Sequence, residues 1–177
     1  YTGKGDGGVS DVGKGKKVDK TCVEIEVLGD LDELNSFIGV VKNQGVSEEF
    51  RVILDGVQES LFIIQANAAN FMFPEFKAPA LLPEKITEME RLIEGFEARV
   101  QPEKGFVVPG ANATSGWFDI LRAIARRAER SVIAFSRTQS LSPEILAYCN
   151  RLSSLFFAMA RVAAKEAGMQ EKHPEYK

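Results

Sequence analysis

Histidine, cysteine and tryptophan are scarce in this 177-residue chain, which has one, two and one of them respectively. The single histidine is His173, close to the C-terminal residue Lys177. Di-iron helical bundles use inward-facing Glu-x-x-His pairs, and structural zinc sites use clusters of Cys and His, so neither kind of centre is supported. A Ser-His-Asp or Cys-His nucleophile system would have to use this terminal histidine, which argues against both.

Long apolar runs and a surplus of positive charge are also missing. No apolar stretch approaches the ~20 residues that a membrane span requires. The formal net charge of −3 provides no general attraction to nucleic acid or to anionic membranes. The length and the 45% apolar content suit one globular domain over residues 1–177 with a single core.

The two cysteines, Cys22 and Cys149, lie far apart and form no Cys-x-x-Cys pair. They indicate free thiols in a reducing compartment, and one distant disulfide is the alternative. Because the sequence begins at Tyr1 and not at Met, a preceding targeting segment is left open.

Helical periodicity dominates the chain after residue 21. Residues 22–28 (CVEIEVL) are expected to be a short strand or extended chain, with Asp30 capping the first helix. Ser and Pro at the later helix starts are favoured cap and first-turn residues. The expected helices are Asp30 to about Lys42, Ser47 to about Phe71, one opened by Pro83, Thr114 to Arg137, and Ser142 to near Gly168.

This pattern predicts an all-α fold, a five-helix antiparallel bundle over residues 22–168. A Gly- and Lys-rich loop over residues 1–21 precedes the bundle, and a tail over residues 169–177 follows it. The glycines of the loop would let backbone N–H groups approach phosphates closely, whereas a flexible arm is the alternative. A Walker A motif is rejected, because Gly15 follows Lys14 where Ser or Thr is required and no hydrophobic strand precedes the loop.

The most informative stretch is LRAIARRAER, residues 121–130 of the predicted fourth helix. Arg122, Arg126 and Glu129 share one face, Arg130 lies beside them, and Arg127 is turned about 100° away. One interpretation is a solvated face of weak ion pairs on a purely structural bundle. The other is a clamp for a polyphosphate, because guanidinium groups bind phosphate oxygens with a planar fork of donors.

Four other residues have the same ambiguity. Asp32 and Glu33 suit the first turn of a helix, and either could instead anchor an arginine of the fourth helix. Asn150 could face solvent or hydrogen-bond a ligand. Phe106, in the link GFVVPG, could plug the end of the core or form the wall of a pocket.

Five blocks in order carry a resemblance: YTGKGDGG, GDLDELNSFIG, FVVPG, LRAIARRAER and YCNRLSSLFFAMAR. Together they resemble the PduO-type ATP:corrinoid adenosyltransferases over residues 1–165. The resemblance implies a homotrimer with active sites between subunits. It also implies transfer of the 5′-deoxyadenosyl group of ATP to the cobalt of cob(I)alamin, with triphosphate leaving together with Mg²⁺. A non-catalytic ATP- or corrinoid-binding or delivery module on the same bundle is the alternative.

By matching positions, the resemblance also implies the site. Arg122 pairs with Asp32 of an adjacent subunit and shapes the corrinoid side. Phe106 displaces the lower axial ligand of cobalt, and Glu129 orients the neighbouring arginines. The implied catalytic residues are Arg122, Arg126, Asp32 and Phe106. The implied ATP-binding residues are Thr2, Gly3, Lys4, Gly5, Ser10, Asp11, Lys20, Arg126, Arg127, Ala128, Glu129, Arg130 and Asn150.

Such an enzyme needs no nucleophile of its own, because the corrinoid supplies the reactive atom. The resemblance implies a corrinoid reductase and an adenosylcobalamin-dependent enzyme as partners, in the cytoplasm or, in a eukaryote, the mitochondrial matrix. Gly7 stands where the family often has Lys, and GANATSGW follows Pro109 where the family is usually richer in glycine. Neither departure removes a residue of the phosphate clamp.

Overall fold

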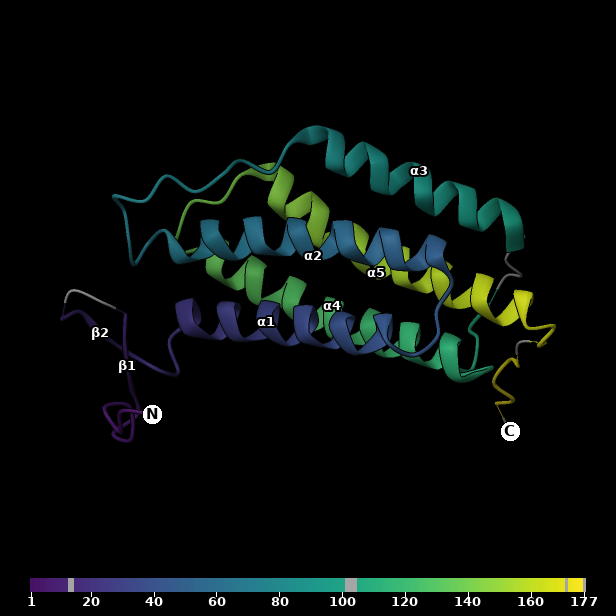
Figure 1. Ribbon diagram of the computed structural model, residues 1–177, viewed down its shortest axis with the longest axis horizontal. Coiled ribbons are helices and arrows are strands. Elements are labelled where there is room, and N and C mark those ends of the chain that lie inside the picture. The colour runs from purple at the N-terminus through teal and green to yellow at the C-terminus, as the bar shows by residue number, and fades with distance from the viewer. Residues whose placement is uncertain (13–14, 101–104, 171, 177) are drawn as a thin grey trace.

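The computed structural model describes residues 1–12, 15–100, 105–170 and 172–176. Within these residues the chain forms five helices and one small antiparallel hairpin (Figure 1). The hairpin pairs β1 (Val9–Asp11) with β2 (Lys17–Asp19), and Ser10 lies opposite Val18. The helices are α1 (Val23–Lys42), α2 (Glu48–Ala69), α3 (Pro83–Val100), α4 (Ala113–Ser136) and α5 (Pro143–Glu166). The predicted five-helix fold is confirmed.

Capping groups and a first-turn proline explain where three helices begin. The Ser47 hydroxyl accepts a hydrogen bond from the Phe50 amide at the start of α2, at 3.3 Å. At the start of α4, Asn112 and Ser115 form a reciprocal capping box, with bonds of 2.7 and 2.9 Å. Pro143 is the first residue of α5. Ser142 occupies the N-cap position, but its side chain makes no capping hydrogen bond to the described residues of α5.

The prediction for the start of α1 was wrong. Residues 23–28 are helical, and Asp30 lies inside α1 rather than at its cap. Val27 and Leu31 are both fully buried, four residues apart, so the apolar spacing of this segment continues the helix. A short apolar run with alternating glutamates fits strand and helix periods equally, and packing against α4 decides for helix. The hairpin inside the predicted loop was also not foreseen.

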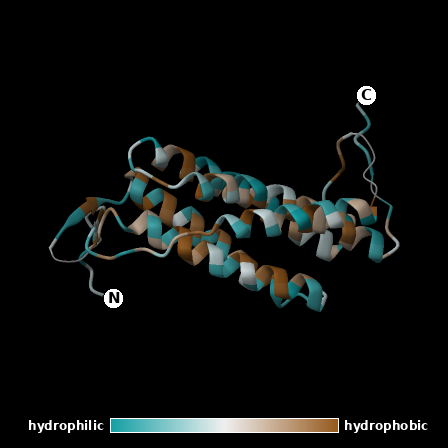
Figure 2. Ribbon diagram, turned by 90° about the horizontal axis from the view of Figure 1, so that it is seen from above, coloured by the Kyte–Doolittle hydropathy of each residue, from teal (hydrophilic) through white to brown (hydrophobic). Residues whose placement is uncertain are grey.

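The core lies along α4 and α5, which pack together more extensively than any other pair of elements. Helix α1 packs on α4, α3 packs on α5, and α2 packs on α1. Four alanines of α5 allow close approach of the neighbouring backbones; they are Ala158, Ala160, Ala163 and Ala164. Hydrophobic and hydrophilic bands alternate along the helices, as amphipathic helices require (Figure 2).

The hairpin and the link before α4 lie at opposite ends of the long axis of the bundle (Figure 1). The hairpin is beside the start of α1, and the link over residues 105–112 is beside the C-terminal tail. The Val108 amide donates to the Lys172 carbonyl at 2.7 Å, so the tail is attached to this link. None of the described helices has the length and apolar content to cross a bilayer.

Candidate active site

The arginines of α4 fall into two groups that follow the helical phase. Arg127 points to α1, where it forms ion pairs with Asp30, at 3.3 Å, and with Glu33. The hydrogen bond with Glu33 raises the pKa of Arg127 above its ordinary value, and burial opposes this. Glu33 therefore anchors an arginine of the fourth helix. This was one of the two interpretations of Glu33 from the sequence, the other being a role in the first turn of a helix.

Arg126 and Arg130 are exposed on another side of α4. Arg130 donates a hydrogen bond to the Arg126 carbonyl at 3.0 Å. Within the described part of the chain, no carboxylate forms an ion pair with either guanidinium group. Two adjacent cations without an acidic partner among the described residues are available to an anion.

Asn150 joins this side from α5. Its amide nitrogen donates to a Glu129 carboxylate oxygen at 2.7 Å, and its amide oxygen accepts from Arg151, also at 2.7 Å. Glu129 therefore accepts a hydrogen bond from Asn150. Among the described residues it forms no ion pair with an arginine. In the part of the chain that the structure describes, the Glu129 carboxylate faces α5, and the expected orientation of the arginines by Glu129 stays a prediction.

A shallow hollow of about 240 Å³ lies next to this cluster. It is lined by residues of α3, α4 and α5, namely Glu97, Arg122, Arg126, Ser153, Ser154 and Phe157. The hollow places the two arginines that the sequence assigned to different roles on one continuous surface. The serines and Phe157 were not foreseen, since each looks like an ordinary position of a helix.

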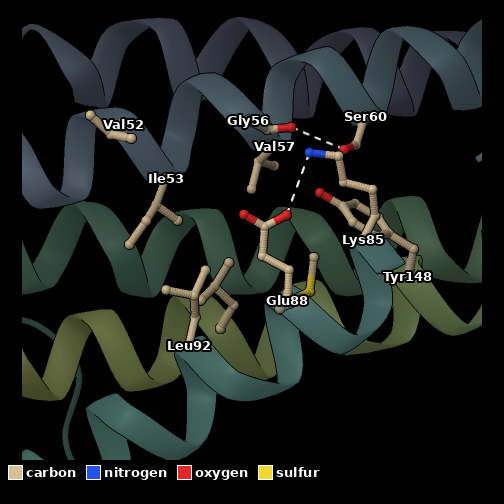
Figure 3. A pocket seen from close by; sticks show the side chains of 11 residues that line it. Val52, Ile53, Gly56, Val57, Ser60, Lys85, Glu88, Leu92 and Tyr148 are labelled. Atoms are coloured by element: carbon tan, nitrogen blue, oxygen red, sulfur yellow. Dashed lines mark hydrogen bonds and ion pairs between the residues drawn. The ribbon is translucent and has the colours of Figure 1, made fainter. Parts of the chain in front are cut away.

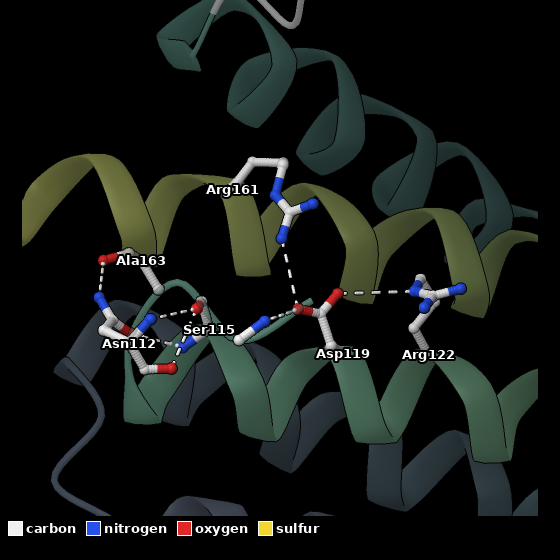
Figure 4. A network of polar contacts seen from close by, with 7 residues as sticks. Asn112, Ser115, Asp119, Arg122, Arg161 and Ala163 are labelled. Atoms are coloured by element: carbon white, nitrogen blue, oxygen red, sulfur yellow. Dashed lines mark hydrogen bonds and ion pairs between the residues drawn. The ribbon is translucent and has the colours of Figure 1, made fainter. Parts of the chain in front are cut away.

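Beneath this surface lies a buried polar network around Asp119 (Figure 4). One carboxylate oxygen of Asp119 accepts from the Gly110 amide at 2.9 Å and faces Arg161 at 3.3 Å. The other oxygen faces the Arg122 Nε at 3.6 Å. Sequence reasoning missed Asp119 and Arg161, although a charged residue inside the apolar stripe of a helix is a usable signal.

Phe106 does not plug the core, and that interpretation was wrong. Its side chain is 77% exposed at the end of the bundle. Its carbonyl oxygen lies 2.9 Å from the His173 Nδ1. The link is bound to the tail through its backbone, which leaves the ring free to form a wall.

The Gly-rich loop is folded compactly around Gly5. The Lys20 ammonium donates to the Gly5 carbonyl at 2.9 Å, and a Cβ built on Gly5 would lie 2.9 Å from that nitrogen. Gly3 and Gly8 have φ values of +66° and +79°, in the left-handed region that favours glycine. The loop therefore gathers the Gly3–Gly5 segment and Lys20 in one place, with Ser10 and Asp11 on β1.

The family described as cobalamin adenosyltransferase matches residues 1–163. The chain belongs to this family. The corrinoid adenosyltransferase of Citrobacter freundii is 36% identical over 167 residues, covering 92% of this chain and 93% of that protein. The corrinoid adenosyltransferase of Bacillus subtilis is 34% identical over 173 residues, covering 96% and 88%.

Solved structures of this family share the fold. A phenylalanine-to-alanine variant of the PduO-type ATP:corrinoid adenosyltransferase from Lactobacillus reuteri, complexed with cobalamin and ATP, superposes with a TM-score of 0.90 at 25% identity. The match covers 99% of each chain. The resemblance stated from the sequence blocks is confirmed at the level of family and fold.

Among the described residues of this member of the cobalamin adenosyltransferase family, the predicted site residues do not all meet. Arg126, Arg130 and Asn150 come together on α4 and α5. Asp32 is exposed on α1, and no described ion pair reaches it. Phe106 precedes α4, whereas Arg130 lies 17 residues after its start at Ala113, about 26 Å along the axis at about 1.5 Å per residue. The loop residues lie at the other end of the bundle.

A second hollow, of about 220 Å³, opens between α2, α3 and α5 (Figure 3). Its lining is mainly aliphatic, with Ser60, Lys85, Glu88 and Tyr148 at one side, and it contains none of the predicted site residues. Burial raises the pKa of Tyr148 above its ordinary value.

The cysteines are both free, so the alternative of a distant disulfide is wrong. Burial raises the pKa of Cys149 to about 12, which keeps it a neutral thiol of the core.

Proposed function

We propose that this protein transfers the 5′-deoxyadenosyl group of ATP to the cobalt of cob(I)alamin, giving adenosylcobalamin and triphosphate. The observation that carries the proposal is the exposed pair Arg126 and Arg130 beside Asn150, without an acidic partner in the described subunit, in a chain of the cobalamin adenosyltransferase family. The proposed substrates are the two molecules with which the Lactobacillus reuteri enzyme is complexed, cobalamin and ATP.

The reaction forms one bond and breaks one. The nucleophilic cobalt(I) attacks C5′ of ATP, the C5′–O bond breaks, and its electron pair leaves with the triphosphate. Arg126 and Arg130 stabilise the negative charge that develops on the leaving group, and Mg²⁺ accompanies the phosphates. The remaining task of the protein is to hold C5′ over the cobalt, a positioning effect. No side chain has to act as nucleophile or general base.

The ATP site proposed here combines the arginines and Asn150 with the Gly-rich loop. The glycine backbone of this loop and the lysines Lys4 and Lys20 suit a triphosphate. Thr2, Gly3, Gly5, Ser10 and Asp11 complete the loop side, and Arg127, Ala128 and Glu129 complete the helix side. Arg127 supports this site mainly by fixing α4 against α1, because its guanidinium is already paired with Asp30 and Glu33.

The active site lies between subunits of a homotrimer. The separation of the loop from Phe106 along the bundle supports this arrangement, since one subunit does not bring the two together. Asp32 of one subunit pairs with Arg122 of its neighbour, and the exposure of Asp32 leaves it available for that contact.

Phe106 forms the apolar wall of the corrinoid side. An aromatic ring below the cobalt excludes the lower axial ligand, and the resulting four-coordinate cobalt(II) is easier to reduce. The 77% exposure of this ring in one subunit supports a role in contact with a substrate rather than with the core. A corrinoid that must be kept reduced also suits a reducing compartment, the cytoplasm or the mitochondrial matrix, with a reductase and an adenosylcobalamin-dependent enzyme as partners.

The test is an anaerobic mixture of the protein, chemically reduced cobalamin and MgATP. We expect loss of the cob(I)alamin absorbance together with release of triphosphate in equal amounts. A rate of adenosylcobalamin formation no higher than in a protein-free control would overturn the enzymatic proposal. A thermal shift with MgATP in a protein that fails this assay would favour the alternative, a binding or delivery module, because a ligand of the folded state raises the unfolding midpoint.

A further inference from the structure

The buried carboxylate of Asp119 stands at the junction of three parts of the molecule (Figure 4). It lies on α4 and accepts the Gly110 amide of the Phe106 link. It also faces Arg161 of α5 and Arg122 of its own helix. Asp119 is 5% exposed and Arg161 is 3% exposed, so this is a core contact rather than a surface ion pair.

The contact with Gly110 determines where the Phe106 link meets α4. Gly110 has a φ of +86°, in the left-handed region that favours glycine. The link passes close to the first turn of α4, because a Cβ built on Gly116 would lie 3.6 Å from the Gly110 Cα. The carboxylate thus helps to fix the end of the link nearest to α4, together with Asn112, whose side-chain amide nitrogen donates to the Ala163 carbonyl at 3.0 Å.

The contact with Arg122 places the arginine at the edge of the hollow. The Arg122 Nε is buried and lies 3.6 Å from an Asp119 oxygen, an ion pair without a full hydrogen bond. Arg161 extends the network to the same hollow, since its guanidinium lies 4.8 Å from the centre of the Phe157 ring. One carboxylate therefore contacts the link that carries Phe106 and two guanidinium groups at the hollow.

We propose that Asp119 is a positioning residue that holds the Phe106 link and Arg122 in a fixed relation on the corrinoid side of the site. This inference rests on the proposed function. Asp119 is not a catalytic residue, because it is buried below the surface that meets the substrates. Its loss loosens the corrinoid wall and leaves the ATP clamp of Arg126, Arg130 and Asn150 in place.

The decisive variants are Asp119→Ala and Asp119→Asn. Alanine removes both the acceptor for Gly110 and the charge that faces the arginines. Asparagine keeps an oxygen for Gly110 and removes only the charge. We expect Asp119→Ala to raise the KM for cobalamin at least about tenfold and to leave the KM for ATP within about twofold. We expect Asp119→Asn to fall between Asp119→Ala and the unmodified protein.

Hydrogen exchange supplies a readout that does not depend on activity. In Asp119→Ala the amides of residues 105–112 should exchange faster, while those of α2 stay unchanged. Asp119→Asn should largely restore the protection of this segment, because Gly110 keeps its acceptor. This arm can be decided even if the unmodified protein makes no adenosylcobalamin, so failure of the proposed function is distinguishable from failure of this inference.

Two controls separate positioning from loss of stability. Ile64→Val removes one methylene from the core of α2 and lowers stability without touching the network. Asp55→Asn removes a carboxylate from an ion pair with Lys42. Both should leave the two KM values and the exchange of residues 105–112 unchanged. The inference is overturned if Asp119→Ala changes neither the exchange of that segment nor the KM for cobalamin, or if it raises both KM values equally.

Discussion

Two sides of α4 carry the same residue type and differ in what neutralises it. On the side that faces α1, Arg127 is held by the carboxylates of Asp30 and Glu33. On the other side, Arg126 and Arg130 have no described acidic partner, and Asn150 lies near them. The number of arginines in LRAIARRAER therefore does not indicate what each one binds. Their positions around the helix do, because these separate the arginine that anchors α4 to α1 from the two that are available to an anion.

Arg126→Ala is expected to have the largest effect on ATP kinetics, and it tests the side of α4 that is available to an anion. It removes a cation of the proposed triphosphate clamp. A charge-assisted hydrogen bond contributes about 1.5–3 kcal/mol, and about 1.4 kcal/mol corresponds to a tenfold change. We expect kcat/KM for ATP to fall roughly 10- to 100-fold. Steady-state assays with reduced cobalamin measure it, and an Arg126→Ala enzyme with unchanged ATP kinetics would contradict the clamp.

A second change tests the proposed corrinoid wall, which Phe106 forms in the link before α4. Phe106→Ala should impair turnover that starts from cobalt(II) about tenfold more than turnover that starts from pre-reduced cobalt(I). The reason is that, in the proposed function, the ring acts on the coordination of cobalt before reduction and not on the attack at C5′. Two parallel assays measure the two rates. One starts from cobalt(II) and includes the reduction step, and the other starts from pre-reduced cobalt(I). Equal losses in both assays would defeat the axial-ligand argument.

Arg127→Ala should behave as the anchor rather than the clamp. It removes two partly exposed ion pairs between α4 and α1, each of which contributes about 0.2–1 kcal/mol to the free energy of unfolding. We expect a small decrease in the unfolding midpoint and a change in kcat/KM for ATP of less than about threefold. If Arg127→Ala loses as much ATP activity as Arg126→Ala, the division of α4 into two sides is wrong.

The smallest effect is expected for Glu129→Gln. The amide of glutamine keeps an acceptor for Asn150 and removes a negative charge beside the arginines. Because the group is partly solvated, the Kd for MgATP should change by less than about twofold. Titration calorimetry with MgATP provides the measurement. A large loss of affinity would show that Glu129 acts on the arginines directly.

Much of the fold follows from local signals. Ser47, Pro83 and Pro143 mark helix starts within a residue of where the structure has them, because caps and first-turn prolines act locally. The start of α1 does not follow, because Val23 to Leu28 fits two periods and the choice is made by packing on α4. The hairpin is equally hidden, since its strands are three residues each.

The site was predictable only in part. The sequence blocks identify the arginine run and Asn150, and they resemble a family that the comparisons confirm. They do not reveal that Glu129 bonds Asn150 or that Asp119 joins Gly110 to Arg161, because these partners are 21, 9 and 42 residues apart and meet only in the folded bundle. Helical phase gives a direction for each side chain, and tertiary packing gives it a partner.

The placement of the hairpin and of Phe106 at opposite ends of the bundle has a consequence for mixtures of damaged subunits. In the proposed trimer, each site takes its hairpin from one subunit and its aromatic wall from the next. A subunit damaged only in the hairpin and one damaged only at Phe106 would then complement each other, because a mixed ring contains one junction at which both parts are intact. Damage to Arg126 and to Asn150 admits no such rescue between those two positions, because α4 and α5 of the same chain carry both residues.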